Sequence, residues 1–408
     1  MFEKYKSLSR EVYVIALSKL VASMGAFIWP LFTLILTSKT NLDVGEISVY
    51  MTVMVFVNIA ASITGGLLSD KIGRKIIIVI FELLGMLSYF MILFFPVGIA
   101  TAVLLMAGMA FFGVAWPAHD ALIANVTKTE ERETAYGLGY MASNLGLVFG
   151  PAVGGFLIRD HFSTFIIIDV VTTFLGWLLL VTLVKEPNMT QEKENKLEEV
   201  TNKSVLQVVK ERPVIIYYGL LLLVTSIIYG QIDFTLPLYF ESLFDNFEQN
   251  FGFIFSLNGL VVVLFTPVIT HVFTKLKSMT KILIGIILYM MSMLMYSQFS
   301  VLGFLLFSMF VFTIGEIFIQ VGSAPVMSKL VPANMMARAS SVIGIFYTIG
   351  HLIAINIPGY LLDNNYTFKF TWLVIVGVSL IGVLYLLWFS SAYKKTLNYI
   401  DDFEKNRK

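Results

Sequence analysis

The sequence contains no cysteine and little charge. Without cysteine there is no disulfide, no thiolate nucleophile and no cysteine-ligated metal. Charged residues make up 13% of the 408 residues and hydrophobic residues 57%, whereas a soluble domain carries roughly 25% charged residues. A chain with so little charge cannot cover the surface of a soluble protein, and its apolar content excludes disorder. The composition therefore predicts a protein dissolved in lipid.

Several functional classes are excluded by other absences. The net charge of +1 lacks the basic footprint that a nucleic-acid partner requires. No Gly-Lys dipeptide occurs, so no phosphate-cradling loop is present, and we expect no cofactor. Four scattered histidines do not indicate a metal site. No carboxylate pair or nucleophile–base set indicates an enzyme.

Apolar runs bounded by charge give twelve candidate membrane spans. We therefore expect an all-α membrane protein with 12 transmembrane helices in two pseudo-symmetric six-helix halves. The runs cover about 12–36, 46–68, 76–95, 99–122, 135–158, 163–184, 214–240, 250–273, 282–299, 301–326, 339–361 and 370–391.

Lysine and arginine gather on one side of this arrangement. With an even number of spans, 24 of the 28 Lys and Arg residues lie on the side of the two termini. The opposite side has Lys39, Arg159 and Lys369, and Lys19 falls inside the first span. The positive-inside rule then predicts a multi-pass protein of the cell membrane with both termini in the cytoplasm.

A long polar segment divides the chain near its midpoint. We expect an N-terminal bundle over 1–184, a cytoplasmic linker over 185–213, a C-terminal bundle over 214–391 and a cytoplasmic tail over 392–408. Trp29-Pro-Leu-Phe32 recurs as Leu236-Pro-Leu-Tyr239, which indicates a duplicated fold.

The loop after the second span reads Gly66-Leu-Leu-Ser-Asp70-Lys71-Ile-Gly73-Arg74-Lys75. As a short cytoplasmic turn, it uses Gly73 for backbone freedom and supplies cations that anchor the loop. The motif resembles the hallmark of the major facilitator superfamily. The resemblance implies a gating latch formed by Gly66, Asp70, Gly73, Arg74 and Lys75, and Asp120 at the cytoplasmic end of span 4 is placed near these cations.

Span 5 carries small residues at intervals of four. Gly146, Gly150, Pro151, Gly154 and Gly155 form a flat face for close helix packing, and Pro151 can kink the helix. The pattern resembles the antiporter signature of the superfamily's drug exporters. An ordinary packing surface remains the alternative interpretation.

Ionisable side chains inside a membrane span are costly, so each one requires a reason. Glu316 lies about 22 Å along span 10, and Asp233 lies toward the outer end of span 7. Structural hydrogen bonding and contact with water are the alternatives for these two acids. The remaining intramembrane groups are Lys19, Glu82, His119, Asp120, Asp169 and His351. Among them Asp169 is expected to be a hydrated helix start near the outer face.

Two segments sharpen the resemblance. Gln231-x-Asp233-x-x-Leu-Pro237 and Thr313-Ile-Gly315-Glu316 resemble segments of the superfamily's multidrug:proton antiporters. The resemblance implies proton coupling and drug binding for Asp233 and Glu316. Gly139 stands near the position where that family has a further acid.

The expected substrate pocket lies between the halves. Candidate lining residues are Phe27, Trp29, Trp116, Asn144, Tyr229, Gln231 and Asn258. Ordinary lipid-facing or core packing is the alternative for each of them.

The sequence as a whole predicts a proton-coupled exporter of lipophilic, cationic drugs that works by alternating access, with a role in antibiotic resistance. We expect it to be a monomer whose partners are a small lipophilic molecule, protons and membrane lipids. A lipid or glycolipid flippase, a metabolite:proton symporter and a membrane receptor or scaffold remain alternatives on the same scaffold.

Overall fold

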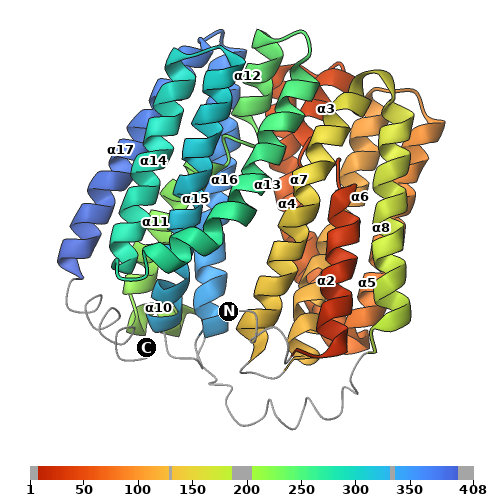
Figure 1. Ribbon diagram of the computed structural model, residues 1–408, viewed down its shortest axis with the longest axis horizontal. Helices are drawn as coiled ribbons and strands as arrows, with labels where there is room; N and C mark the ends of the chain where they lie inside the picture. Colours follow the sequence, from red (N-terminus) through yellow and green to blue (C-terminus); the bar gives the residue numbers. More distant parts are fainter. Residues whose placement is uncertain (1–7, 128–130, 186–204, 331–335, 394–408) are drawn as a thin grey trace. The chain divides into compact units, whose positions relative to one another are not determined.

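The computed structural model describes residues 8–127, 131–185, 205–330 and 336–393, and every regular element in these residues is helical (Figure 1). The α-helices are α2 (Arg10–Met24), α3 (Phe32–Lys39), α4 (Val44–Ile72), α5 (Arg74–Met91), α6 (Ile99–Asn125), α7 (Arg132–Asp160), α8 (Phe162–Leu183), α10 (Val205–Glu211), α11 (Val214–Tyr229), α12 (Thr235–Leu243), α13 (Phe247–Val272), α14 (Ser278–Gln298), α15 (Leu302–Leu330), α16 (Met336–Asp363) and α17 (Phe368–Ala392). A 3-10 turn, η1 (Ile92–Phe94), follows α5.

Ten helices among the described residues are long and apolar enough to cross a membrane. The other two expected spans are each divided into two helices. The first span becomes α2 and α3, separated at 25–31, and the seventh becomes α11 and α12, separated at 230–234. The all-α membrane fold predicted from the sequence is thus confirmed, and twelve crossings are consistent with it.

The chain divides into two compact units. The first comprises Met1–Glu192 and Pro237–Val263, and the second comprises Lys193–Leu236 and Leu264–Lys408. The predicted linker lies mostly at 186–204, outside the described residues, and its end forms α10. The predicted tail lies outside them from residue 394 onward. The division into two six-helix halves stays a prediction.

In the first unit, α2 packs against α7 and α8, while α6 packs against α4 and α5 (Figure 1). The apolar core toward one end of this unit includes Ile77, Val114, Leu122 and Leu180. Gly176 lets α8 approach α2 closely, because a Cβ built there would lie 2.7 Å from the Ser18 carbonyl oxygen. Burial of such side chains and close backbone approach are the usual means of helix association in lipid.

In the second unit, α14 packs against α15 and α17, and α11 packs against α16 (Figure 1). Gly285 of α14 and Gly315 of α15 meet at the closest point, because a Cβ on either would lie within 2.8 Å of the other's carbonyl oxygen. This approach fixes the position of Glu316, the next residue along α15. The ring of Trp372 on α17 stacks on Tyr296 with centroids 5.1 Å apart.

Local sequence signals set several helix ends. The Asp43 side chain accepts a hydrogen bond from the Glu46 amide, and the Glu46 side chain accepts one from the Asp43 amide, so the two form a capping box at the start of α4. Between α4 and α5, Gly73 has φ of +104°, a value that glycine adopts without the steric cost of a side chain. At the start of α17, Thr367 accepts a hydrogen bond from the Phe370 amide.

Candidate functional site

The break in the first span is held by a buried carboxylate. Oδ2 of Asp169, on α8, accepts hydrogen bonds from the amides of Phe27 and Ile28 at 2.8 and 2.9 Å. Asp169 is 4% exposed, so the expectation of a hydrated helix start is wrong. Amides at an interrupted helix lose their regular helical acceptors, and this carboxylate supplies one to each amide; the Phe27 amide also donates to the Gly25 carbonyl at 2.8 Å. Sequence reasoning missed this role because the partner lies about 140 residues away.

The break in the seventh span is held by amide and hydroxyl groups instead. Nε2 of Gln231 donates to the carbonyls of Ile227 and Ala354, at 2.8 and 3.2 Å, and its Oε1 accepts from the Thr235 hydroxyl at 2.6 Å. Gly230 lets α16 approach, since a Cβ there would lie 2.6 Å from that of Ala354 and 3.1 Å from Nδ1 of His351. The break therefore joins α11, α12 and α16.

Asp233 and Glu316, the two acids predicted to work together, are brought to one place in the second unit. Asp233 lies in the break, and Glu316 is the middle residue of the 29-residue helix α15. Both side chains are half-buried. The phenol of Tyr229 interacts electrostatically with both carboxyl groups, and Tyr347 of α16 does the same. Two carboxyl groups and two phenols thus share a region of the membrane interior.

An aromatic stack adjoins these acids. The rings of Tyr229 and Phe312 lie 6.0 Å apart, and Phe312 stacks on Tyr289 with centroids 4.2 Å apart. Faces of such rings attract cations. Phe312 and Tyr289 are buried, so Tyr229, which is half-buried, is the ring of this stack that a cation beside the acids can meet.

The other predicted cavity residues divide by exposure. Phe27 and Gln231 are buried and belong to the two breaks. In the first unit Trp29 is 49% exposed and meets Phe255 edge to face, while Trp116 is 65% exposed. Asn144 and Asn258 are half-buried.

The loop between α4 and α5 is anchored to the end of α8. Nζ of Lys75 donates to the carbonyl of Val184 at the end of α8, at 2.8 Å. Arg74 is 4% exposed, which places its charge against protein. A Cβ added to Gly66 would meet nothing within 4 Å. The side chain of Asp70 lies outside the described residues, so the latch stays a prediction.

Asp120 has a neighbour on α2, and its gating role stays a prediction. Its carboxylate interacts electrostatically with Lys19 of α2, and its backbone carbonyl accepts from the Tyr136 hydroxyl at 2.8 Å. Nζ of Lys19 also lies 3.7 Å from the place that a Cβ on Gly139 would occupy. A cation of the first span therefore adjoins Gly139.

The glycines of α7 form a packing surface with two sides. A Cβ on Gly146 would lie 2.5 Å from that of Ser23, and one on Gly154 would lie 2.9 Å from Leu31, so this side receives α2 and the first break. A Cβ on Gly155 would lie 2.5 Å from the Glu248 carbonyl oxygen, and one on Gly252 would overlap the Pro151 carbonyl, so the other side receives α13. A Cβ on Gly150 would lie 3.1 Å from the Ser23 carbonyl oxygen, on the α2 side.

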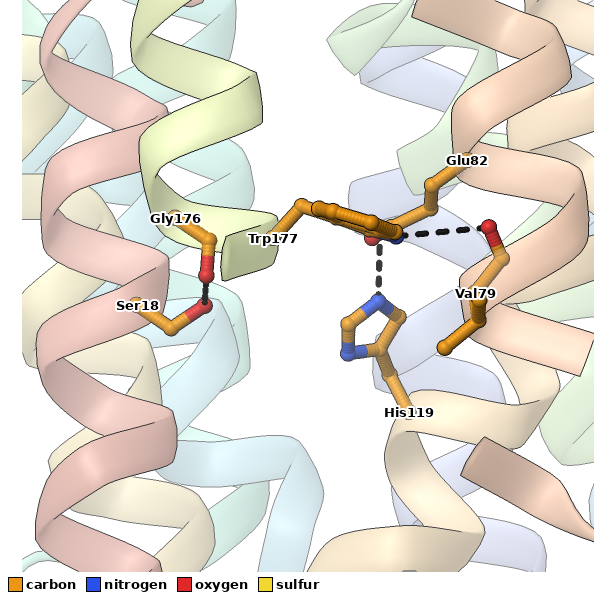
Figure 2. A network of polar contacts seen from close by, with 6 residues as sticks. All are labelled: Ser18, Val79, Glu82, His119, Gly176 and Trp177. Atoms are coloured by element: carbon orange, nitrogen blue, oxygen red, sulfur yellow. Dashed lines mark hydrogen bonds and ion pairs between the residues drawn. The ribbon is translucent and has the colours of Figure 1, made fainter. Parts of the chain in front are cut away.

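A further polar pair joins α5 and α6 in the first unit. Nε2 of His119 lies 2.7 Å from Oε1 of Glu82 (Figure 2). Nearby, the indole of Trp177 donates to the Val79 carbonyl and the Ser18 hydroxyl donates to the Gly176 carbonyl (Figure 2). The sequence marks both members of the pair as intramembrane groups but does not predict their pairing. No group of three or more His, Asp or Glu that could hold a metal occurs among the described residues.

A family model described as Major Facilitator Superfamily matches residues 15–355. The chain belongs to this superfamily. An antiporter of Planococcus maritimus named "Na(+), Li(+), K(+)/H(+) antiporter" is 25% identical over 373 residues, which is 83% of this chain and 86% of that protein. The quinolone resistance protein NorA of Staphylococcus aureus (strain MRSA252) is 33% identical over 129 residues, about 30% of each chain.

Solved structures of peptide transporters share the fold. The POT family transporter PepTSo superposes with a TM-score of 0.76 over 95% of this chain and 98% of that one, at 13% identity. The peptide transporter POT in complex with sulfate gives a TM-score of 0.70 at 17% identity over 95% of both chains. At this identity the likeness shows the superfamily's fold alone. The family and these neighbours are transporters, and we therefore describe the chain as a multi-pass membrane transporter of the superfamily.

Proposed function

We propose that the protein is a proton-coupled antiporter that exports lipophilic cations by alternating access. The observation that carries the proposal is the meeting of Asp233, Glu316 and Tyr229 in the second unit. A carboxyl group in the membrane interior binds either a proton or a cation, because a lone negative charge is costly there. Competition between proton and substrate for the same acids couples their opposite movements.

The aromatic stack supports a lipophilic cation as the substrate. Phe312 and Tyr289 are buried against each other, and the half-buried ring of Tyr229 beside them adjoins both acids, so a flat cation at Tyr229 meets a ring and negative charge together. The relationship of one chain segment to a quinolone resistance protein supports export of a drug.

The test uses purified protein in proteoliposomes loaded with acidic buffer and placed in neutral buffer containing a fluorescent lipophilic cation such as ethidium. We expect the wild type to accumulate the dye and to release lumenal protons. Glu316→Gln and Asp233→Asn should fall to the level of empty liposomes. The matched control is Asp363→Asn, which removes an exposed carboxyl group at the end of α16 and should transport normally. Full coupling in Glu316→Gln and Asp233→Asn alike would contradict the proposal.

A second candidate is exchange of a monovalent metal cation for protons at the same acids. The relationship to the Planococcus maritimus antiporter over most of the chain favours it. In the same proteoliposomes, Na⁺ or K⁺ added outside would then release lumenal protons without any dye. If neither salt releases protons while the dye does, the lipophilic cation is the substrate.

A further inference from the structure

The Glu82–His119 pair lies inside membrane-spanning helices of the first unit, whereas Asp233 and Glu316 belong to the second. Its two side chains are 15% and 18% exposed. The residues beside it on α5 and α6, Ile78, Ala118 and Leu122, are fully buried. An ionisable pair in such surroundings is expensive, and by default it indicates a function.

The unpartnered ring nitrogen of His119 shows how many protons the pair holds. Nδ1 is buried and has no hydrogen-bond partner in the described part of the chain. A proton on Nδ1 would be a buried donor without an acceptor, which is costly. The proton therefore belongs on Nε2, which donates it to Oε1 of an ionised Glu82. In this conformation the pair is a neutral imidazole and a carboxylate, with a net charge of −1.

We propose that Glu82 and His119 form a second proton-binding site of this protein, separate from the acids of the second unit. The incoming proton binds to the lone pair of Nδ1, while Nε2–H stays hydrogen-bonded to Glu82. The product is an imidazolium–carboxylate pair with no net charge. Its new Nδ1–H needs an acceptor or water, so protonation favours a conformation other than the one described here.

Other titratable groups occupy the helices that pack around the pair. Arg74 lies about two turns from Glu82 on α5, roughly 12 Å along the axis. Asp169 accepts hydrogen bonds from two backbone amides of the first break. Asp120 follows His119 but interacts with Lys19 and Tyr136. The remaining titratable residues on α4, α5, α6, α7 and α8 are Glu46, Tyr50, Asp70, Lys71, Lys75, Tyr89, Arg132, Glu133, Tyr140, Arg159 and Asp160.

The test is nitrogen-15 NMR of the full-length protein in nanodiscs, labelled only at its four histidines. His119→Gln assigns the relevant signals by their loss. At neutral pH we expect a protonated Nε2 and an unprotonated Nδ1, and between about pH 8 and 5 we expect Nδ1 to become protonated. In Glu82→Gln, which keeps a hydrogen-bonding side chain, the proton affinity of His119 should fall about tenfold, because the stabilising negative charge is gone.

Two further variants make the result decisive. His161→Gln removes a histidine at the junction of α7 and α8 and should leave the His119 titration unchanged. Trp177→Phe removes a neighbouring hydrogen bond without removing a charge. The proton affinity of His119 in this variant should therefore stay within about twofold of the wild-type value. Three outcomes would overturn the proposal: a His119 ring that stays neutral down to about pH 5, a neutral ring with its proton on Nδ1, or a His119 titration that is unchanged in Glu82→Gln. The pair would then be a structural hydrogen bond. Because no substrate is used, this outcome is independent of the proposed drug transport.

Discussion

At the scale of single residues, a carboxylate within a span can serve structure or transport, and its partners distinguish the two. Asp169 receives two backbone amides within 2.9 Å and is buried, so its acceptor capacity is used by the protein itself. Asp233 and Glu316 are half-buried and share the electrostatic environment of Tyr229. The first acid therefore stabilises the break, while the other two fit proton or cation exchange.

Replacing Asp169 tests the structural role. Asp169→Ala removes the carboxylate acceptor of the Ile28 amide, at about 1–3 kcal/mol, while the Phe27 amide keeps the Gly25 carbonyl as an acceptor. We expect a clearly lower midpoint of thermal unfolding, measured by size-exclusion chromatography after heating at one fixed rate, since unfolding of such proteins is often irreversible. Asp169→Asn keeps an acceptor oxygen and should lose less stability. Equal midpoints for wild type and Asp169→Ala would show that the break is held by other contacts.

At the scale of elements, the interrupted spans and the glycine face of α7 belong together. Gly146, Gly150 and Gly154 let α2 and the residues after it lie directly against α7. In lipid, where apolar burial gives helices little reason to associate, such close packing supplies the attraction. The antiporter-like motif therefore has a packing function in the first unit, whatever it adds to transport.

Two glycines of α7 provide a matched comparison. Gly146→Ala puts a Cβ within 2.5 Å of Ser23, and overpacking of this kind costs about 1–3 kcal/mol. The Cβ added by Gly137→Ala meets nothing within 4 Å. Alanine is also more favourable than glycine inside a helix by about 1 kcal/mol. We expect the unfolding midpoint to fall in the first variant and to stay level or rise in the second. A similar response of both variants would mean that α7 does not pack closely against α2.

At the scale of the whole molecule, charge places the chain in the membrane. Lys39 and Arg159, predicted to lie on the same side, do lie together, because Nζ of Lys39 donates to the Arg159 carbonyl at 2.8 Å. The Arg159 guanidinium in turn donates to the carbonyl of Asp245 at 2.7 Å. Outer loops with few cations and inner loops with many follow the positive-inside rule, which predicts cytoplasmic termini.

The absence of cysteine makes the orientation directly measurable. Two exposed positions suit single cysteines. Asn364 lies in the turn between α16 and α17, and Lys277 lies in the turn between α13 and α14. A membrane-impermeant maleimide should label Asn364→Cys on intact cells and Lys277→Cys only after permeabilisation. The cysteine-free wild type gives the background. The reverse pattern would place the termini outside.

The candidate site was partly predictable from the sequence. Asp233 and Glu316 stand out because charge is rare inside apolar runs, and that rule needs no coordinates. The pairing of Glu82 with His119 and the role of Asp169 were not predictable, since each partner lies 37 or more residues away. Buried neighbours, rather than local pattern, decide which groups meet.

Local physical rules let the sequence alone determine the helical membrane fold, the spans and the loops. Apolar runs must satisfy their backbone hydrogen bonds within the segment, and such runs therefore become helices. Only the tertiary structure decided that spans 1 and 7 break, because an interrupted helix is stable where other groups satisfy its exposed amides and carbonyls. The distant Asp169 does this for the first break, and in the seventh Gln231, within the break, satisfies the Ile227 carbonyl and reaches the distant Ala354 carbonyl. The shortage of charge that defines the composition thus leaves a few polar side chains to hold the breaks and, as we propose, to carry protons.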